Sequence, residues 1–191
     1  MKITTTLQLL RTKNMYAPRY EHLLKSLGAG WPDKRPINLL QILEYSGAED
    51  ALRALRAAQE PEADRIARII ACECAETVLH IFELKFPGDT RPRDAIRMSR
   101  RFVIGKVTQA ELRTARIAAG DAACAWPAPY AAYNAAYAAY YAAAANATDG
   151  AAFAGWRSVI AAAKASRDIG QKEARAAAWD QIGAVIRRHL S

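Results

Sequence analysis

The sequence is poor in the residues that most often carry out chemistry. Only 3 histidines and 3 cysteines occur among its 191 residues. It contains no glycine-rich phosphate loop, no nucleophile elbow and no catalytic triad arrangement. An odd number of cysteines does not build a disulfide framework and is typical of a reducing compartment. We therefore predict a cytoplasmic protein that is not an enzyme and that uses no cofactor or metal.

Long apolar runs and a secretion signal are also missing. The first 15 residues have no long apolar stretch and no small-residue cleavage site, so we expect no signal peptide. The one apolar run, at residues 127–147, is interrupted by tyrosine hydroxyls and asparagine and is bounded by prolines. We therefore expect no membrane span.

Positive charge exceeds negative charge, and the formal net charge is +8. A basic balance permits either nucleic acid or an acidic protein as a partner and selects neither. Alanine dominates the hydrophobic fraction of 52%, and the bulky apolar residues are concentrated before residue 105. We therefore expect the core to be richest in the N-terminal half, whereas the C-terminal half relies on close helix approach through alanine.

Apolar residues recur at helical spacing along the chain, and turn residues separate the segments. We predict an all-α fold, a bundle of about eight helices with an alanine-rich C-terminal half. Residues 1–60 would form a small N-terminal helical part and residues 61–191 the main bundle. The segment 61–86 is apolar around most of its circumference, which predicts a central helix.

Several local signals predict where individual helices begin and end. Thr4–Thr6 are expected to cap a helix, because no later segment offers a convincing strand partner. Residues 48–59 are expected to form one helix, Gly120 to interrupt another, and residues 146–150 to form a turn. Thr108 and Glu111 have the spacing of a capping box.

A one-sided row of arginines follows Pro92, at Arg93, Arg97, Arg100 and Arg101. Such a row can bind phosphates, or it can be the solvated face of an amphipathic helix. The preceding turn contains Asp89 and Arg91 and predicts a helix–helix corner. There, the arginines are expected to pair with carboxylates such as Glu83 and so to hold the corner.

Aromatic residues trace one stripe along the alanine-rich segment. The stripe consists of Trp126, Tyr130, Tyr133, Tyr137, Tyr140 and Tyr141. It could stack unpaired bases, bind a protein partner, or pack against neighbouring helices with the hydroxyls in water. These three interpretations remain open at the level of sequence.

Acidic residues and a histidine share one strip of the predicted central helix, at Glu73, Glu76, His80 and Glu83. A metal site in a bundle needs a matching set from other helices, and the sequence shows no second Glu-x-x-His. We therefore interpret the strip as a structural one that pairs with the arginine-rich helix. Cys72 and Cys74 lie about 200° apart around the helix axis and cannot share a ligand site.

Residues 74–96, CAETVLHIFELKFPGDTRPRDAI, resemble the signature of the immunity-5-like immunity proteins. The positions that match are Cys74, Ala75, Glu76, Phe82, Glu83, Pro87, Asp89, Arg91, Pro92, Arg93, Ala95 and Ile96. The first 60 residues resemble the leading part of alanine-rich proteins that phages and prophages encode. The family often carries histidines in its later helices, whereas this chain has none between His80 and His189.

The resemblance implies an all-α protein that neutralises a target by binding it. We predict a non-enzymatic protein that binds a protein partner, such as a toxin or a host defence protein, with nucleic acid as the alternative partner. Homo-oligomerisation is a further alternative, because alanine-lined faces suit symmetric packing. The predicted contact residues are Arg91, Arg93, Arg97, Arg100, Arg101, Tyr130, Tyr133, Tyr137 and Tyr140, and the predicted structural corner comprises Glu76, Glu83, Asp89 and Pro92.

Overall fold

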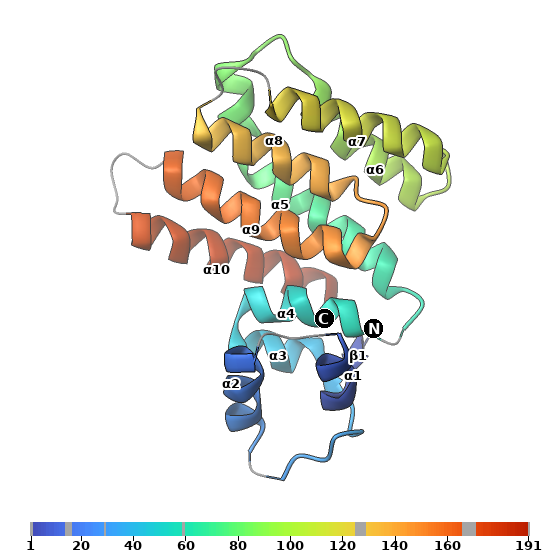
Figure 1. Cartoon of the computed structure of the whole chain (residues 1–191), viewed down its shortest axis with the longest axis vertical. Coiled ribbons are helices and arrows are strands. Elements are labelled where there is room, and N and C mark those ends of the chain that lie inside the picture. The colour runs from blue at the N-terminus through green and yellow to red at the C-terminus, as the bar shows by residue number, and fades with distance from the viewer. Residues whose placement is uncertain are drawn as a thin grey trace.

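A computed structural model describes residues 2–13, 17–28, 30–58, 60–124, 129–165 and 171–190. Within these ranges the protein has ten α-helices, one short 3-10 helix and one pair of two-residue strands (Figure 1). The all-α prediction is therefore confirmed, with a helix count close to the expected one. In the same ranges, none of the helices is long and apolar enough to cross a membrane.

Short elements make up the N-terminal part. They are β1 (Thr4–Thr5), α1 (Leu7–Thr12), α2 (Ala17–Leu27), β2 (Ile37–Asn38), α3 (Leu39–Ser46), α4 (Ala48–Ala54) and the 3-10 helix η1 (Leu55–Ala57). Thr6 caps α1, as predicted, because its side chain accepts a hydrogen bond from the Leu9 amide. The expectation of one helix over 48–59 was wrong in its second half, which tightens into η1.

The prediction that Thr4–Thr6 have no strand partner was also wrong. Thr4 pairs with Asn38 and Thr5 with Ile37 in an antiparallel register. Distant groups hold this segment extended, since the Thr4 amide donates to the Glu60 carboxylate at 2.9 Å and Thr5 Oγ1 donates to the Ala57 carbonyl at 2.7 Å. These contacts span more than 50 positions and could not be read from local spacing.

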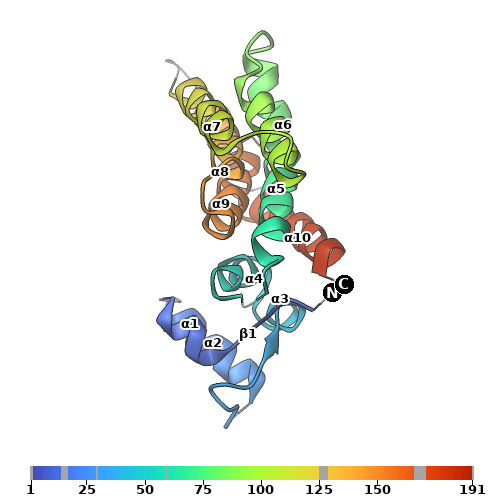
Figure 2. The same cartoon turned by 90° about the vertical axis from the view of Figure 1, so that its right-hand side faces the viewer.

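Six longer helices form the main bundle. They are α5 (Ala63–Lys85), α6 (Arg91–Val103), α7 (Gln109–Ala123), α8 (Tyr130–Ala142), α9 (Ala147–Ala165) and α10 (Gln171–Leu190). Helix α5 contacts α6, α8, α9 and α10 and is therefore central, as its all-round apolar pattern predicts. Figure 2 shows α8 and α9 on one side of α5.

Alanine and glycine allow the C-terminal helices to approach closely. In α8, Ala132, Ala135, Ala136, Ala138, Ala139 and Ala142 are all buried. At Gly155 of α9, an added Cβ would lie only 2.5 Å from Leu52 Cδ1 of α4. Among the largest fully buried side chains of the described residues, all except Leu112 precede residue 105. This distribution matches the expectation from composition.

Two predicted breaks lie inside helices instead. Gly120 belongs to α7, where the missing side chain makes room for the Tyr140 ring, 3.1 Å from the position of a Cβ. Residues 147–150 form the first turn of α9, and Asn146 Oδ1 accepts a hydrogen bond from the Asp149 amide at 3.0 Å. Asn146 therefore caps a helix, and Gly120 permits a close contact between helices. The predicted helix start at Pro127 lies outside the described residues.

One hydrophobic core runs through both parts of the chain, from Ile3 in the first segment to Leu190 in the last helix. Helices α3 and α4 contact α10, and α4 also contacts α9. The N-terminal part is therefore packed against the bundle and shares its core. The boundary between residues 60 and 61 stays a prediction.

Candidate arginine groove and aromatic surface

The turn between α5 and α6 contains local hydrogen bonds from Arg91 to Asp89. Asp89 Oδ1 accepts from the Arg91 amide at 3.1 Å and from Arg91 Nε at 2.8 Å, while Oδ2 accepts from Nη2 at 2.6 Å. These bonds lower the pKa of Asp89. Pro92 lies in the first turn of α6, where a missing amide hydrogen costs nothing.

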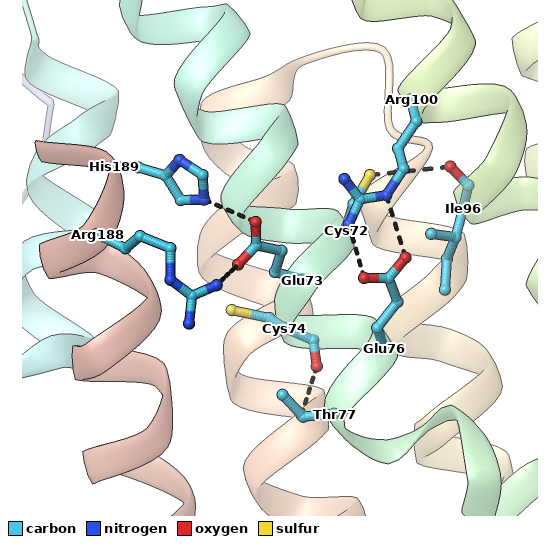
Figure 3. Close-up of polar contacts among 9 residues, drawn as sticks. All are labelled: Cys72, Glu73, Cys74, Glu76, Thr77, Ile96, Arg100, Arg188 and His189. Atoms are coloured by element: carbon cyan, nitrogen blue, oxygen red, sulfur yellow. Dashed lines mark hydrogen bonds and ion pairs between the residues drawn. The ribbon is translucent and has the colours of Figure 1, made fainter.

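Two bidentate ion pairs connect the arginine row of α6 to the acidic strip of α5. Arg93 donates to both carboxylate oxygens of Glu83 at 2.6 Å. Arg100 donates to Glu76 at 3.1 and 2.6 Å (Figure 3). In each pair, the hydrogen bonds to the carboxylate raise the pKa of the arginine, Arg93 or Arg100. The carboxylates therefore fix the direction of two guanidinium groups on the surface.

These arginines border a groove of about 400 Å³ between α5 and α6. Its lining residues are Glu76, Leu79, Arg93, Ile96, Arg97, Arg100, Arg101 and Ile104. Leu79 and Ile96 are buried at its base, whereas Ile104 is 62% exposed. The structure thus brings four of the predicted contact arginines together around an apolar surface, while Arg91 does not line the groove.

The arginines of the groove differ in how they are paired. Arg97 pairs with Asp94 on its own helix at 3.0 Å. Arg101 has no carboxylate within 4 Å among the residues that the structure describes. Among the described residues, Arg101 therefore has no close ion pair, and Arg97 has an exposed pair within α6. Arg93 and Arg100 are instead held by carboxylates of α5.

The acidic residues of α5 form ion pairs with two different helices, α6 and α10. Glu73 lies on the other side of α5 and contacts α10, with Arg188 Nη1 at 2.9 Å and His189 Nε2 at 2.7 Å (Figure 3). His80 is exposed and takes no part in these contacts. Across the described ranges, no three histidine, cysteine or acidic side chains gather as a metal site would require.

The cysteines are reduced in the structure and differ in exposure. Cys72 and Cys74 are buried in α5, and burial raises the pKa of Cys72 to about 11 and that of Cys74 further. Both thiols are therefore protonated at neutral pH and poor nucleophiles. Cys124 is exposed, and its sulfur lies 3.6 Å from the Tyr137 hydroxyl.

The tyrosine stripe is a ladder of mutually packed rings. Neighbouring centroids lie 4.6 Å apart for Tyr133 and Tyr137, and 5.5 Å apart for Tyr137 and Tyr140. Tyr130 is 55% exposed, whereas the other predicted tyrosines are half-buried against the core. Tyr140 also accepts a hydrogen bond from Arg116 Nη2 at 2.6 Å. Trp126 lies outside the described residues.

A second surface feature was missed by the sequence patterns. Phe153 and Trp156 of α9 border a cavity of about 180 Å³ together with Arg53, Arg56 and Asp149. An aromatic pair at i and i+3 among alanines is a signal that could have been noticed. The arginines, however, lie about 100 positions earlier, and only the packing of α4 and η1 on α9 brings them to the aromatic pair.

The comparisons with known proteins agree with the motif at the α5–α6 corner. The sequence model of the Imm-5 like putative immunity protein family matches residues 57–184, about two thirds of the chain and all of the motif segment. No curated protein and no solved structure matches the chain. The resemblance seen in residues 74–96 is thus confirmed, and this chain belongs to the family of Imm-5 like putative immunity proteins.

Proposed function

We propose that this protein is a non-enzymatic immunity protein that captures a protein partner through the α5–α6 groove. The observation that supports this most is the grouping of Arg93, Arg97, Arg100 and Arg101 around an apolar base in one groove. Arginine and a buried apolar centre are the features that dominate binding energy at protein interfaces. A partner with an acidic surface around an apolar side chain would complement this groove in charge and chemistry.

The ion pairs across the groove favour a protein partner over nucleic acid. Arg93 and Arg100 are each held by a carboxylate from α5, and those carboxylates would repel a nearby phosphate backbone. The tyrosine rings pack on one another, which leaves fewer ring faces for stacking bases. Family membership also supports binding to a protein. Such a protein would act in the cytoplasm, where its thiols stay reduced.

Affinity capture from the native host tests this proposal. The bait is the whole chain, compared with a variant in which Arg93, Arg97, Arg100 and Arg101 are all replaced by alanine. We expect the variant to lose the retained protein while its helicity by circular dichroism is unchanged. The matched control replaces Lys2, Arg113, Lys172 and Arg175, four exposed cations elsewhere, and removes the same charge.

Capture that is equal for the wild type and the groove variant would reject the groove as the docking surface. Equal loss with the control variant would show that net charge alone retains the partner. A gel shift with oligonucleotide at two salt concentrations addresses the alternative, since nucleic-acid affinity falls steeply with salt. Binding at low salt that disappears in the groove variant would favour the nucleic-acid function instead.

A further inference from the structure

The aromatic surface on α9 forms a small pocket with the N-terminal part. Phe153 and Trp156 lie one helical turn apart and are 49% and 41% exposed. Between them and α4–η1, the cavity of about 180 Å³ is also lined by Arg53, Arg56, Asp149 and Ala152. Large exposed aromatic side chains that border a concave surface are typical of a binding site.

The pocket is rich in arginine. Arg53 pairs with Glu49 at 3.1 Å, and Arg56 pairs with Asp149. Arg157 does not line the pocket, and its guanidinium carbon lies 5.1 Å from the centres of both the Trp156 and the Tyr137 rings. Among the described residues Arg157 has no carboxylate within 4 Å, and its Nε has no hydrogen-bond partner. Two arginines and one aspartate line the cavity, so positive charge exceeds negative charge among its lining side chains.

The aromatic wall is fixed from behind by the tyrosine ladder. The Phe153 ring stacks on Tyr141 at 4.9 Å, and Tyr141 packs on Tyr137 at 6.1 Å. Arg157 donates to Asn134 Oδ1 at 2.9 Å and so is held against α8. A wall that is already ordered loses little conformational entropy when a ligand binds.

We propose that this pocket is a second protein-docking site, which takes one large apolar side chain from an acidic segment of a partner protein. The cavity is smaller than the roughly 300–1,000 Å³ of small-molecule sites, and its size suits a single side chain. Tryptophan and arginine are both enriched among the residues that contribute most to binding at protein interfaces. The excess of arginine selects acidic residues beside the anchor. This site is separate from the arginine groove and does not depend on its function.

Fluorescence anisotropy tests the proposal with a labelled peptide, Gly-Asp-Glu-Phe-Asp-Glu-Gly, at low ionic strength. We expect the full-length protein to bind it and Trp156→Ala to weaken binding by about tenfold. The double variant Arg53→Gln, Arg56→Gln should weaken it by a similar factor. Replacing the peptide phenylalanine by serine should have the same effect. The peptide also has the chemistry proposed for the partner of the α5–α6 groove, so independence is tested in the groove variant without Arg93, Arg97, Arg100 and Arg101. In that variant, adding Trp156→Ala should still weaken binding by about tenfold.

Three results would overturn the proposal. They are absence of binding to the wild type, binding that is insensitive to Trp156→Ala and to the Arg53–Arg56 variant, and binding to the groove variant that does not change when Trp156→Ala is added. A labelled oligothymidine that binds in a Trp156-dependent way, and that the peptide does not displace, would assign the pocket to nucleic acid instead. Circular dichroism of each variant verifies that helicity is retained, and because the two arginines are exposed, their variant remains informative if Trp156→Ala unfolds.

Discussion

Arg68 of α5 is a buried cation with an unusual set of partners. It is only 5% exposed, and it donates to the carbonyl of Ala144 at 2.8 Å. Its guanidinium carbon lies 5.0 Å from the centre of the Phe102 ring. Burial lowers its pKa, and among the described residues no carboxylate lies within ion-pair distance. Backbone carbonyl oxygens that follow α8 therefore supply the partial negative charge next to the Arg68 guanidinium.

We expect Arg68→Met to destabilise the protein by about 2 kcal/mol, because it leaves the buried Ala144 carbonyl oxygen without this donor. Urea denaturation followed by circular dichroism measures this. Arg65→Met is the control, since Arg65 is exposed and, within the part of the chain that the structure describes, its ion pair is with Glu62 one turn earlier. Such pairs contribute below about 0.5 kcal/mol. Equal effects of the two substitutions would contradict a stabilising role for Arg68.

At the scale of elements, glycines in α9 and α10 differ in how closely neighbours approach. At Gly150, an added Cβ would lie 2.5 Å from the Tyr141 carbonyl oxygen. At Gly183 the nearest atom would be Leu43 Cδ1 at 3.8 Å, an ordinary contact. The first glycine is therefore required by packing, whereas the second only reduces helix propensity.

We expect opposite signs for alanine at these two positions. Gly150→Ala should lower the free energy of unfolding by about 1–3 kcal/mol, because backbone must move. Gly183→Ala should raise it by up to about 1 kcal/mol through helix propensity. The midpoint of urea denaturation compares both variants with the wild type. Stabilisation by Gly150→Ala would show that α9 can shift away from α8 at little cost.

The α5–α6 corner should make stability depend on pH. The pKa of Asp89 is lowered from its ordinary value of 3.8 by hydrogen bonds from Arg91. The carboxylate therefore stabilises the folded state above pH 3.8, and this contribution disappears as pH falls through the lower folded-state pKa. We expect Asp89→Asn to be less stable than the wild type at pH 7 and the difference to shrink below about pH 4. A difference that is constant with pH in urea denaturation would contradict this linkage.

At the scale of the whole molecule, the shared core should make unfolding cooperative. Leu52 of the N-terminal part packs against Gly155 of the bundle, and one hydrophobic cluster includes both parts. We expect a single thermal transition, with equal calorimetric and van't Hoff enthalpies. Two resolved transitions would show that residues 1–60 and 61–191 unfold separately.

Local spacing was enough to predict much of the secondary structure and the corner motif. The capping box at Thr108 forms as its spacing requires, and the all-round apolar segment is the central helix α5. The family motif could be identified for the same reason, because it is a short continuous segment. The tyrosine stripe was visible as well, but whether its rings face solvent depends on which helices pack beside α8.

The sequence by itself determined which segments are helical, where most helices begin and end, and to which family the chain belongs. Helix formation and helix ends depend on interactions within about four residues along the chain, and the family follows from a continuous motif in the sequence. Tertiary structure alone decided that Thr4–Thr5 pair with Ile37–Asn38. It also decided that the acidic residues of α5 pair with both α6 and α10. Finally, it placed Arg53 and Arg56 beside Phe153 and Trp156. Each of these contacts joins distant residues, and their positions follow from how closely alanine- and glycine-lined helices can pack.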